Sequence, residues 1–246
     1  MISDLCLFML FVHVIGDFQA QTRGMAEHKA TGRGMLMHAG VLSLLSALAG
    51  VLIWLFGMPA GGAFFIVLTL LILHLMLDIL KQWLTSFCRA NLKDSLLFAA
   101  DQLLHVLLIV LVVDVLFAPH AGLIMPLSRP LLKWMLLIAL VTKPANICFK
   151  VIFERYQLNT GPDAAPNDLP EPGAGALIGS LERLLAALFF SLGQYAAVGL
   201  VFTAKSIARF RQIDENKRFA EYYLIGTLFS MLYVLLAYLL IFHAVA

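Results

Sequence analysis

Residues 63–84 read AFFIVLTLLILHLMLDILKQWL, an apolar run long enough to cross a bilayer as one helix. A helix of about 20 apolar residues spans the hydrocarbon core. Six further segments have a similar composition, at residues 2–18, 36–56, 96–117, 131–153, 176–202 and 220–245. Hydrophobic residues make up 61% of the chain and charged residues 13%, whereas a soluble domain has about 25% charged residues. We therefore predict an all-α polytopic transmembrane helix bundle with six to seven spans.

A polar stretch rich in Pro, Asp and Asn divides the chain. Residues 157–173 are predicted to be a linker between an N-terminal membrane bundle, residues 1–156, and C-terminal membrane helices, residues 174–246. The formal net charge of +2 gives no reason to expect a nucleic-acid partner. Membrane lipids are the expected partners, and the oligomeric state stays open.

The positions of the basic residues predict which loops face the cytoplasm. Two early loops are basic, through Arg23, Lys29, Arg33, Arg89 and Lys93. The last loop is the most basic, yet strict alternation of seven spans would place it outside. We therefore expect residues 131–153, which Pro144 interrupts, to be re-entrant or to lie partly in the interface.

Three predicted spans each contain one histidine and one aspartate, four residues apart: His13 and Asp17, His74 and Asp78, and Asp101 and His105. Spacing of four stacks both side chains on one helical face. A further histidine, His38, begins the second span. Ionisable groups within a bilayer cost several kcal/mol unless they face a partner or a cavity. The sequence therefore predicts that these residues converge in a common polar site.

Four imidazoles and three carboxylates are ligand types suited to a divalent metal, with zinc expected first and iron or manganese next. The predicted ligands are His13, Asp17, His38, His74, Asp78, Asp101 and His105. Seven ligands exceed the four of one tetrahedral site, so a two-metal centre is one alternative. A second alternative is that some of the aspartates bind no metal and only orient the ligating histidines. A third is that the whole cluster is an interhelical hydrogen-bond network or a proton relay.

Other ionisable residues are predicted to bind substrate or to stabilise the fold. Lys81 follows His74 by seven residues on roughly the same face, where it would hold a phosphate or carboxylate or extend to the interface. In the C-terminal helices, a structural charge network is expected, because a buried charge needs a partner. Its predicted members are Glu182, Arg183, Lys205, Arg209 and Glu221.

Several of these motifs resemble the bacterial domain-of-unknown-function family 3307. The N-terminal ones are His13-Val-Ile-Gly-Asp17-Phe, His74-Leu-Met-Leu-Asp78 and Asp101-Gln-Leu-Leu-His105, and C-terminal ones include Gly193-Gln194-Tyr195 and Glu221-Tyr-Tyr-Leu-Ile-Gly-Thr227. The resemblance implies a multi-pass protein of the bacterial cytoplasmic (inner) membrane and implies no activity. A looser similarity, in residue types alone, is to membrane-bound metal-dependent hydrolases.

The first functional hypothesis is a metal-dependent hydrolase of a lipid or phosphoester. In it a metal-bound water attacks the substrate, Asp78 acts as general base and Lys81 steadies the anion. The first alternative is a transporter or sensor of metal ions or protons that uses the same cluster. The second is a non-catalytic structural or regulatory membrane protein.

Overall fold

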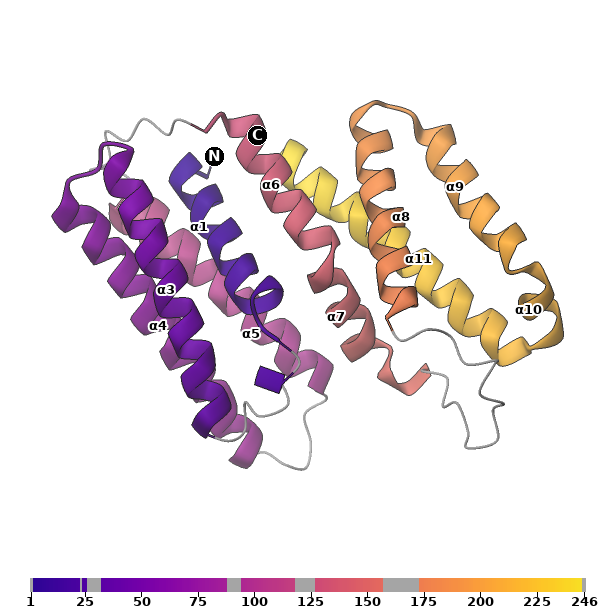
Figure 1. The fold of residues 1–246 in the computed structure, drawn as a ribbon, viewed down its shortest axis with the longest axis horizontal. Helices are drawn as coiled ribbons and strands as arrows, with labels where there is room; N and C mark the ends of the chain where they lie inside the picture. Colours follow the sequence, from indigo (N-terminus) through magenta and orange to yellow (C-terminus); the bar gives the residue numbers. More distant parts are fainter. Residues whose placement is uncertain are drawn as a thin grey trace. The chain divides into compact units, whose positions relative to one another are not determined.

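The computed structural model describes residues 2–22, 24–25, 32–87, 94–117, 127–156 and 173–244. Every regular element in these residues is a helix (Figure 1). Six described helices are long and apolar enough to cross a membrane: Gly32–Leu55, Ala60–Thr85, Asp94–Phe117, Arg129–Ile152, Ala174–Ser191 and Lys217–His243. The predicted all-α polytopic fold is confirmed.

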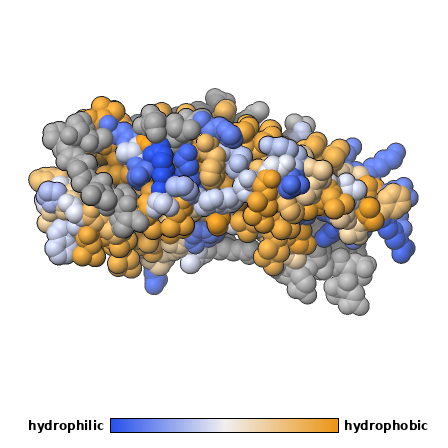
Figure 2. All heavy atoms as spheres, turned by 90° about the horizontal axis from the view of Figure 1, so that it is seen from above, coloured by the Kyte–Doolittle hydropathy of each residue, from blue (hydrophilic) through white to orange (hydrophobic). Residues whose placement is uncertain are grey.

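Hydrophobic side chains cover much of the visible surface (Figure 2). Large examples are exposed on several of the long helices, among them Trp54, Phe64, Leu103, Leu181 and Leu228. A soluble protein rarely exposes apolar patches of this extent. The exposed faces are those expected to contact lipid.

The chain divides into two compact units, Met1–Ala139 and Leu140–Ala246. The division falls near the end of helix α6 (Arg129–Val141), and thus within the N-terminal bundle predicted for residues 1–156. The predicted linker, residues 157–173, lies outside the described residues except for Gly173.

The first unit is built around a short buried helix, α1 (Asp4–Val14), which continues as the π-helix η1 (Ile15–Gln19). All residues from Leu5 to Leu10 are buried, as in a helix that is apolar on every side and lies inside a bundle. With 11 residues in α1 and 5 in η1, this segment is shorter than a membrane-spanning helix. The first predicted span, residues 2–18, is therefore an interior helix.

Longer helices surround α1 in the first unit. They are α3 (Gly32–Leu55), α4 (Ala60–Phe87), α5 (Asp94–Val110) with its π-helical extension η2 (Leu111–Phe117), and α6. At one end of the unit, the Ser3 amide donates to Asp114 on η2, and Arg129 donates to Asp4 at 2.7 Å. These contacts hold the start of α1 against η2 and α6.

The second unit contains α7 (Lys143–Ile152), a 3₁₀ turn η4 (Glu154–Tyr156), α8 (Ala174–Ser191), α9 (Tyr195–Ala208), α10 (Phe210–Glu215), α11 (Lys217–Leu239) and η6 (Leu240–Ala244). The prediction of one span over residues 176–202 is wrong. The chain reverses between α8 and α9 at Gly193, whose φ of +67° is the left-handed conformation that glycine adopts at a helix C-terminus. The apolar composition hides this turn because both helices are apolar.

The reversal at Gly193 also resolves the conflict over the last loop. Helix α9 returns toward the end of the unit at which α8 begins, so the basic segment around α10 lies at that end (Figure 1). The reversal at Gly193 thus accounts for the position of this basic segment without a re-entrant segment at residues 131–153. Residues Arg129–Ile152 instead form a kinked helix pair of membrane-spanning length and composition.

Candidate metal centre

The seven predicted ligands converge in the first unit. His13 and Asp17 come from α1 and η1, His38 from α3, and the remaining two pairs from α4 and α5. All seven are buried, and the most accessible, His74, exposes 9% of its surface. The structure thus brings together seven residues from four helical segments. None of the seven side chains is on a lipid-facing surface.

Helix direction explains the order of the residues within each pair. Helices α1 and α4 run one way and α3 and α5 the other (Figure 1). The histidine precedes the aspartate in α1 and α4, whereas the aspartate comes first in α5. Because α5 runs opposite to α1 and α4 and also has the opposite residue order, the three aspartates lie at one level of the unit. Their histidines lie about 5.4 Å, or one helical turn, farther along it. The aspartate level faces the end of the first unit at which α4 ends and α5 begins (Figure 1).

The closest approaches between imidazole nitrogens and carboxylate oxygens of the cluster lie between helices. His74 Nε2 is 3.0 Å from Asp17 Oδ1, and His38 Nε2 is 3.1 Å from Asp78 Oδ2. His38 Nε2 is also 3.7 Å from Asp17 Oδ1. His38 thus lies between the carboxylates of η1 and α4.

Asp101 and His105 are arranged by further contacts around α5. His105 Nδ1 lies 2.8 Å from the Asp101 carbonyl oxygen, which accepts a hydrogen bond from it. In the neutral ring, Nε2 is then the nitrogen with the free lone pair. Lys81 Nζ and Gln102 Nε2 donate to Asp101 Oδ2 at 2.7 and 3.1 Å. Outer hydrogen bonds of this kind orient the ligands of metal sites.

Several buried ring nitrogens have no hydrogen-bond partner among the described residues. They include both nitrogens of His13, Nδ1 of His38 and Nε2 of His105. A buried polar atom left without a partner costs about 1–3 kcal/mol, so such atoms are rare. Several in one cluster point to a ligand that they bind.

Three combinations of these residues bring three ligand atoms within 4.8 Å of one another. They are His13, Asp17 and His74; His38, His74 and Asp78; and Asp78, Asp101 and His105. Each combines imidazole with carboxylate, a donor set that fits zinc, iron or manganese. The three histidines His13, His74 and His105 alone form no such combination among the described residues.

The family described as Protein of unknown function (DUF3307) matches residues 5–129, slightly more than half of the chain. The chain belongs to the DUF3307 family. No curated protein and no solved structure matches it. All seven residues of the cluster lie in the DUF3307 region, whereas the C-terminal motifs lie beyond it.

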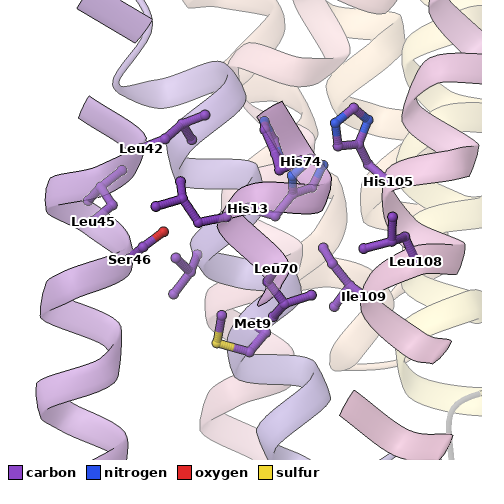
Figure 3. A pocket seen from close by; sticks show the side chains of 12 residues that line it. Met9, His13, Leu42, Leu45, Ser46, Leu70, His74, His105, Leu108 and Ile109 are labelled. Atoms are coloured by element: carbon purple, nitrogen blue, oxygen red, sulfur yellow. The ribbon is translucent and has the colours of Figure 1, made fainter. Parts of the chain in front are cut away.

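A cavity of about 40 Å³ lies beside the histidines of the DUF3307 region (Figure 3). His13, His74 and His105 line it together with Ser46 and apolar side chains that include Met9, Leu70 and Ile109. These three apolar residues stand one helical turn beyond the histidines, on the side away from the aspartates. The volume suffices for at least one water molecule.

Gly16 allows η1 to approach α3 closely. A Cβ atom at this position would lie 2.7 Å from Cδ2 of Leu42, which is one turn from His38. The glycine therefore brings the backbone next to Asp17 against the helix that carries His38. No role was predicted for Gly16 from the sequence. Its position between His13 and Asp17 could have indicated a close approach of another helix.

The C-terminal charged residues lie in the second unit and make separate contacts. Lys205 Nζ donates to Glu182 at 2.7 Å, and Arg209 donates to Gln212 at 3.1 Å. Glu221 is exposed and forms no ion pair with any residue that the structure describes.

Arg183 is buried, yet it forms no ion pair with a carboxylate of the described residues. Its guanidinium donates to the Val141 carbonyl at 2.6 Å, to Asn146 Oδ1 at 2.6 Å and to Ser230 Oγ at 3.2 Å. The Val141 carbonyl lies at the kink between α6 and α7, where Pro144 lacks a backbone N–H. Arg183 therefore supplies donors to this interrupted helix.

Proposed function

We propose that this membrane protein binds a divalent metal ion in the His–Asp cluster and hydrolyses an ester bond of a lipid or another phosphoester. The proposal rests on the convergence of four histidines and three aspartates from four helical segments, with ring nitrogens that have no hydrogen-bond partner among the described residues. Zinc fits the mixed donor set best, and iron or manganese would fit it as well.

Hydrolysis needs a nucleophile, a base and a positive group near the developing negative charge. The metal would supply a bound water of lowered pKa. Asp78 is suited to act as general base, because its carboxylate lies between His38 and the α5 pair, next to the residues that would hold the metal. The water oxygen would bond to the phosphorus or acyl carbon as the bond to the leaving oxygen breaks. Asp78 would take the proton from the water and pass it to the leaving oxygen.

Lys81 is suited to steady the anion. Its side chain is 32% exposed, whereas its partner Asp101 exposes 6%. Lys81 lies one turn beyond Asp78 toward the end of the first unit with the basic loops. An anionic head group that approaches from the cytoplasmic interface would therefore meet Lys81 before it meets the metal ligands.

One observation favours hydrolysis over transport. The cavity wall beyond the histidines is apolar apart from Ser46, with Met9, Leu70 and Ile109 next in line along α1, α4 and α5. A path for ions or protons needs polar groups or water along its whole length. The apolar wall on this side of the histidines therefore suits an enzyme better than a channel.

The resemblance stated above and the six apolar helices support a multi-pass location in the bacterial cytoplasmic membrane. In that setting the aspartate level would lie near the cytoplasmic interface. Membrane phospholipids, or lipid-linked phosphates, are then the substrates most readily available.

The test combines metal analysis with an activity screen. Purified protein in detergent would be analysed for bound metal by mass spectrometry and incubated with bacterial lipid extract and a phosphoester panel. The wild type and His243→Ala, a control at an exposed histidine of the second unit, should bind metal and release product. His74→Ala removes a member of two of the three ligand combinations and should bind less metal and release no product.

Two results would contradict the proposal. If the wild-type protein binds no metal under any loading condition, the cluster is not a metal centre. A metal-loaded protein that releases no product but moves metal or protons across liposome membranes is a transporter.

A further inference from the structure

We infer that the cluster contains two metal positions of unequal affinity, and that the second position fills together with an anionic phosphate group of the substrate. The inference rests on the metal centre proposed above and goes further, because it assigns the number of metals, their order of binding and the class of substrate.

Two of the three ligand combinations share no residue. His13, Asp17 and His74 form one set, and Asp78, Asp101 and His105 form the other. Because each histidine nitrogen binds one metal, these disjoint sets can be occupied at the same time. Three protein ligands leave a coordination position open in each, as in catalytic sites.

His38 connects the two sets. Its Nε2 atom lies 3.7 Å from Asp17 of the first set and 3.1 Å from Asp78 of the second. Paired metals about 3.5–4 Å apart are typical of enzymes that displace a group at phosphorus, in which both metals hold the reacting oxygens. All seven residues of the cluster are thereby used.

The two sets differ in their donors and in the contacts of their carboxylates. Lys81 Nζ donates to Asp101 at 2.7 Å, and Gln102 donates to the same oxygen. No lysine or arginine among the described residues forms an ion pair with Asp17. Lys81 therefore offsets one of the two carboxylate charges of the second set, which leaves both sets with a net charge of −1. The first set has two imidazoles where the second has one, and imidazole nitrogen suits zinc, so the first set is the tighter metal position.

Charge balance predicts how the second position fills. Three ionised aspartates and Lys81 have a formal charge of −2, which one divalent ion neutralises. A second divalent ion would leave +2 in a buried site, where excess charge is unfavourable. An anion that contacts both metals and Lys81 offsets this charge. A phosphate group fits, because several of its oxygens can bind at once.

The experiment measures zinc bound per chain at a fixed free zinc concentration, with and without inorganic phosphate. Wild-type protein should bind one zinc ion without phosphate and two with it, since phosphate and the second metal raise each other's affinity. Lys81→Met should bind the second zinc without phosphate, with an affinity at least about tenfold higher than wild type.

Two variants separate this effect from loss of folding. Lys205→Met removes a cation from another 2.7 Å ion pair, in the second unit, and should bind zinc as the wild type does. Asp101→Asn should keep the first zinc ion and lose the second in the presence of phosphate.

Each remaining outcome has one meaning. One zinc ion in the wild type with and without phosphate overturns the inference and leaves a mononuclear hydrolase. Two zinc ions in the wild type without phosphate overturn the role of Lys81 and of the anion. No zinc under any condition overturns the proposed function itself.

Discussion

Nε2 of His74 on α4 lies 3.0 Å from Oδ1 of Asp17 on η1, closer than either residue lies to the partner on its own helix. His74 is 3.7 Å from Asp78, and His13 is 4.0 Å from Asp17. The spacing of four residues therefore places each histidine and aspartate on one face of their helix. The shortest contacts between imidazole and carboxylate come from packing between helices. Substitutions that alter this packing should affect the cluster without removing a ligand.

Replacing Asp78 tests the assignment of the general base. Asp78→Asn keeps an oxygen donor in place but cannot accept the proton from water. We expect hydrolysis to slow by about 10²–10⁴-fold while at least one metal ion per chain remains bound. Asp94→Asn, at an exposed position in the first turn of α5, is the control and should retain full activity. Complete loss of metal in Asp78→Asn would make Asp78 a required ligand and leave the base unassigned.

Gly16 and Gly40 form a matched pair for testing the approach of η1 to α3. An added Cβ atom at Gly16 would lie 2.7 Å from buried Leu42, whereas nothing lies within 4 Å of one at Gly40. Alanine in a helix is favoured over glycine by about 0.5–1 kcal/mol, so Gly40→Ala should preserve or raise stability. Gly16→Ala should lower it by about 1 kcal/mol or more and weaken metal binding.

Thermal unfolding and metal titration of both variants in detergent provide the measurement. Equal behaviour of Gly16→Ala and Gly40→Ala would show that Leu42 relaxes freely, and that the approach of η1 to α3 does not limit the site.

The ion pair between Glu182 and Lys205 is expected to stabilise the second unit without affecting metal content. Removing one partner leaves a largely buried charge, so Glu182→Gln should lower stability by about 1–3 kcal/mol. Arg211→Gln breaks a pair whose side chains are 88% and 61% exposed and should change stability by less than about 0.5 kcal/mol. Loss of metal in Glu182→Gln with folding intact would contradict this separation of roles.

The reversal at Gly193 predicts the sidedness of the second unit. In a variant without native cysteines, Leu192→Cys should react with a membrane-impermeant thiol reagent from one side of the membrane. Gly175→Cys and Gln212→Cys, at the two ends brought together by the reversal, should react from the other side. The basic residues predict that this side is the cytoplasmic one. Labelling of Gly175→Cys and Gln212→Cys from opposite sides would restore the single span over residues 176–202.

The sequence alone determined the fold class and the residues of the candidate site. Apolar runs of membrane length and a shortage of charge leave a helix bundle in lipid as the physically acceptable fold, because backbone groups in a bilayer need internal partners. Spacing of four within His13 and Asp17, and within His74 and Asp78, is a local property of a helix, so it was readable without a structure.

Only the tertiary structure decided how these segments are used. It put α1 inside the first unit, reversed the chain at Gly193, set Lys81 against Asp101 and set His38 between Asp17 and Asp78. Hydropathy could not reveal these features, because an interior helix and a lipid-facing helix are equally apolar. Contacts between helices depend on packing between residues distant in sequence, which the periodicity of one segment does not encode.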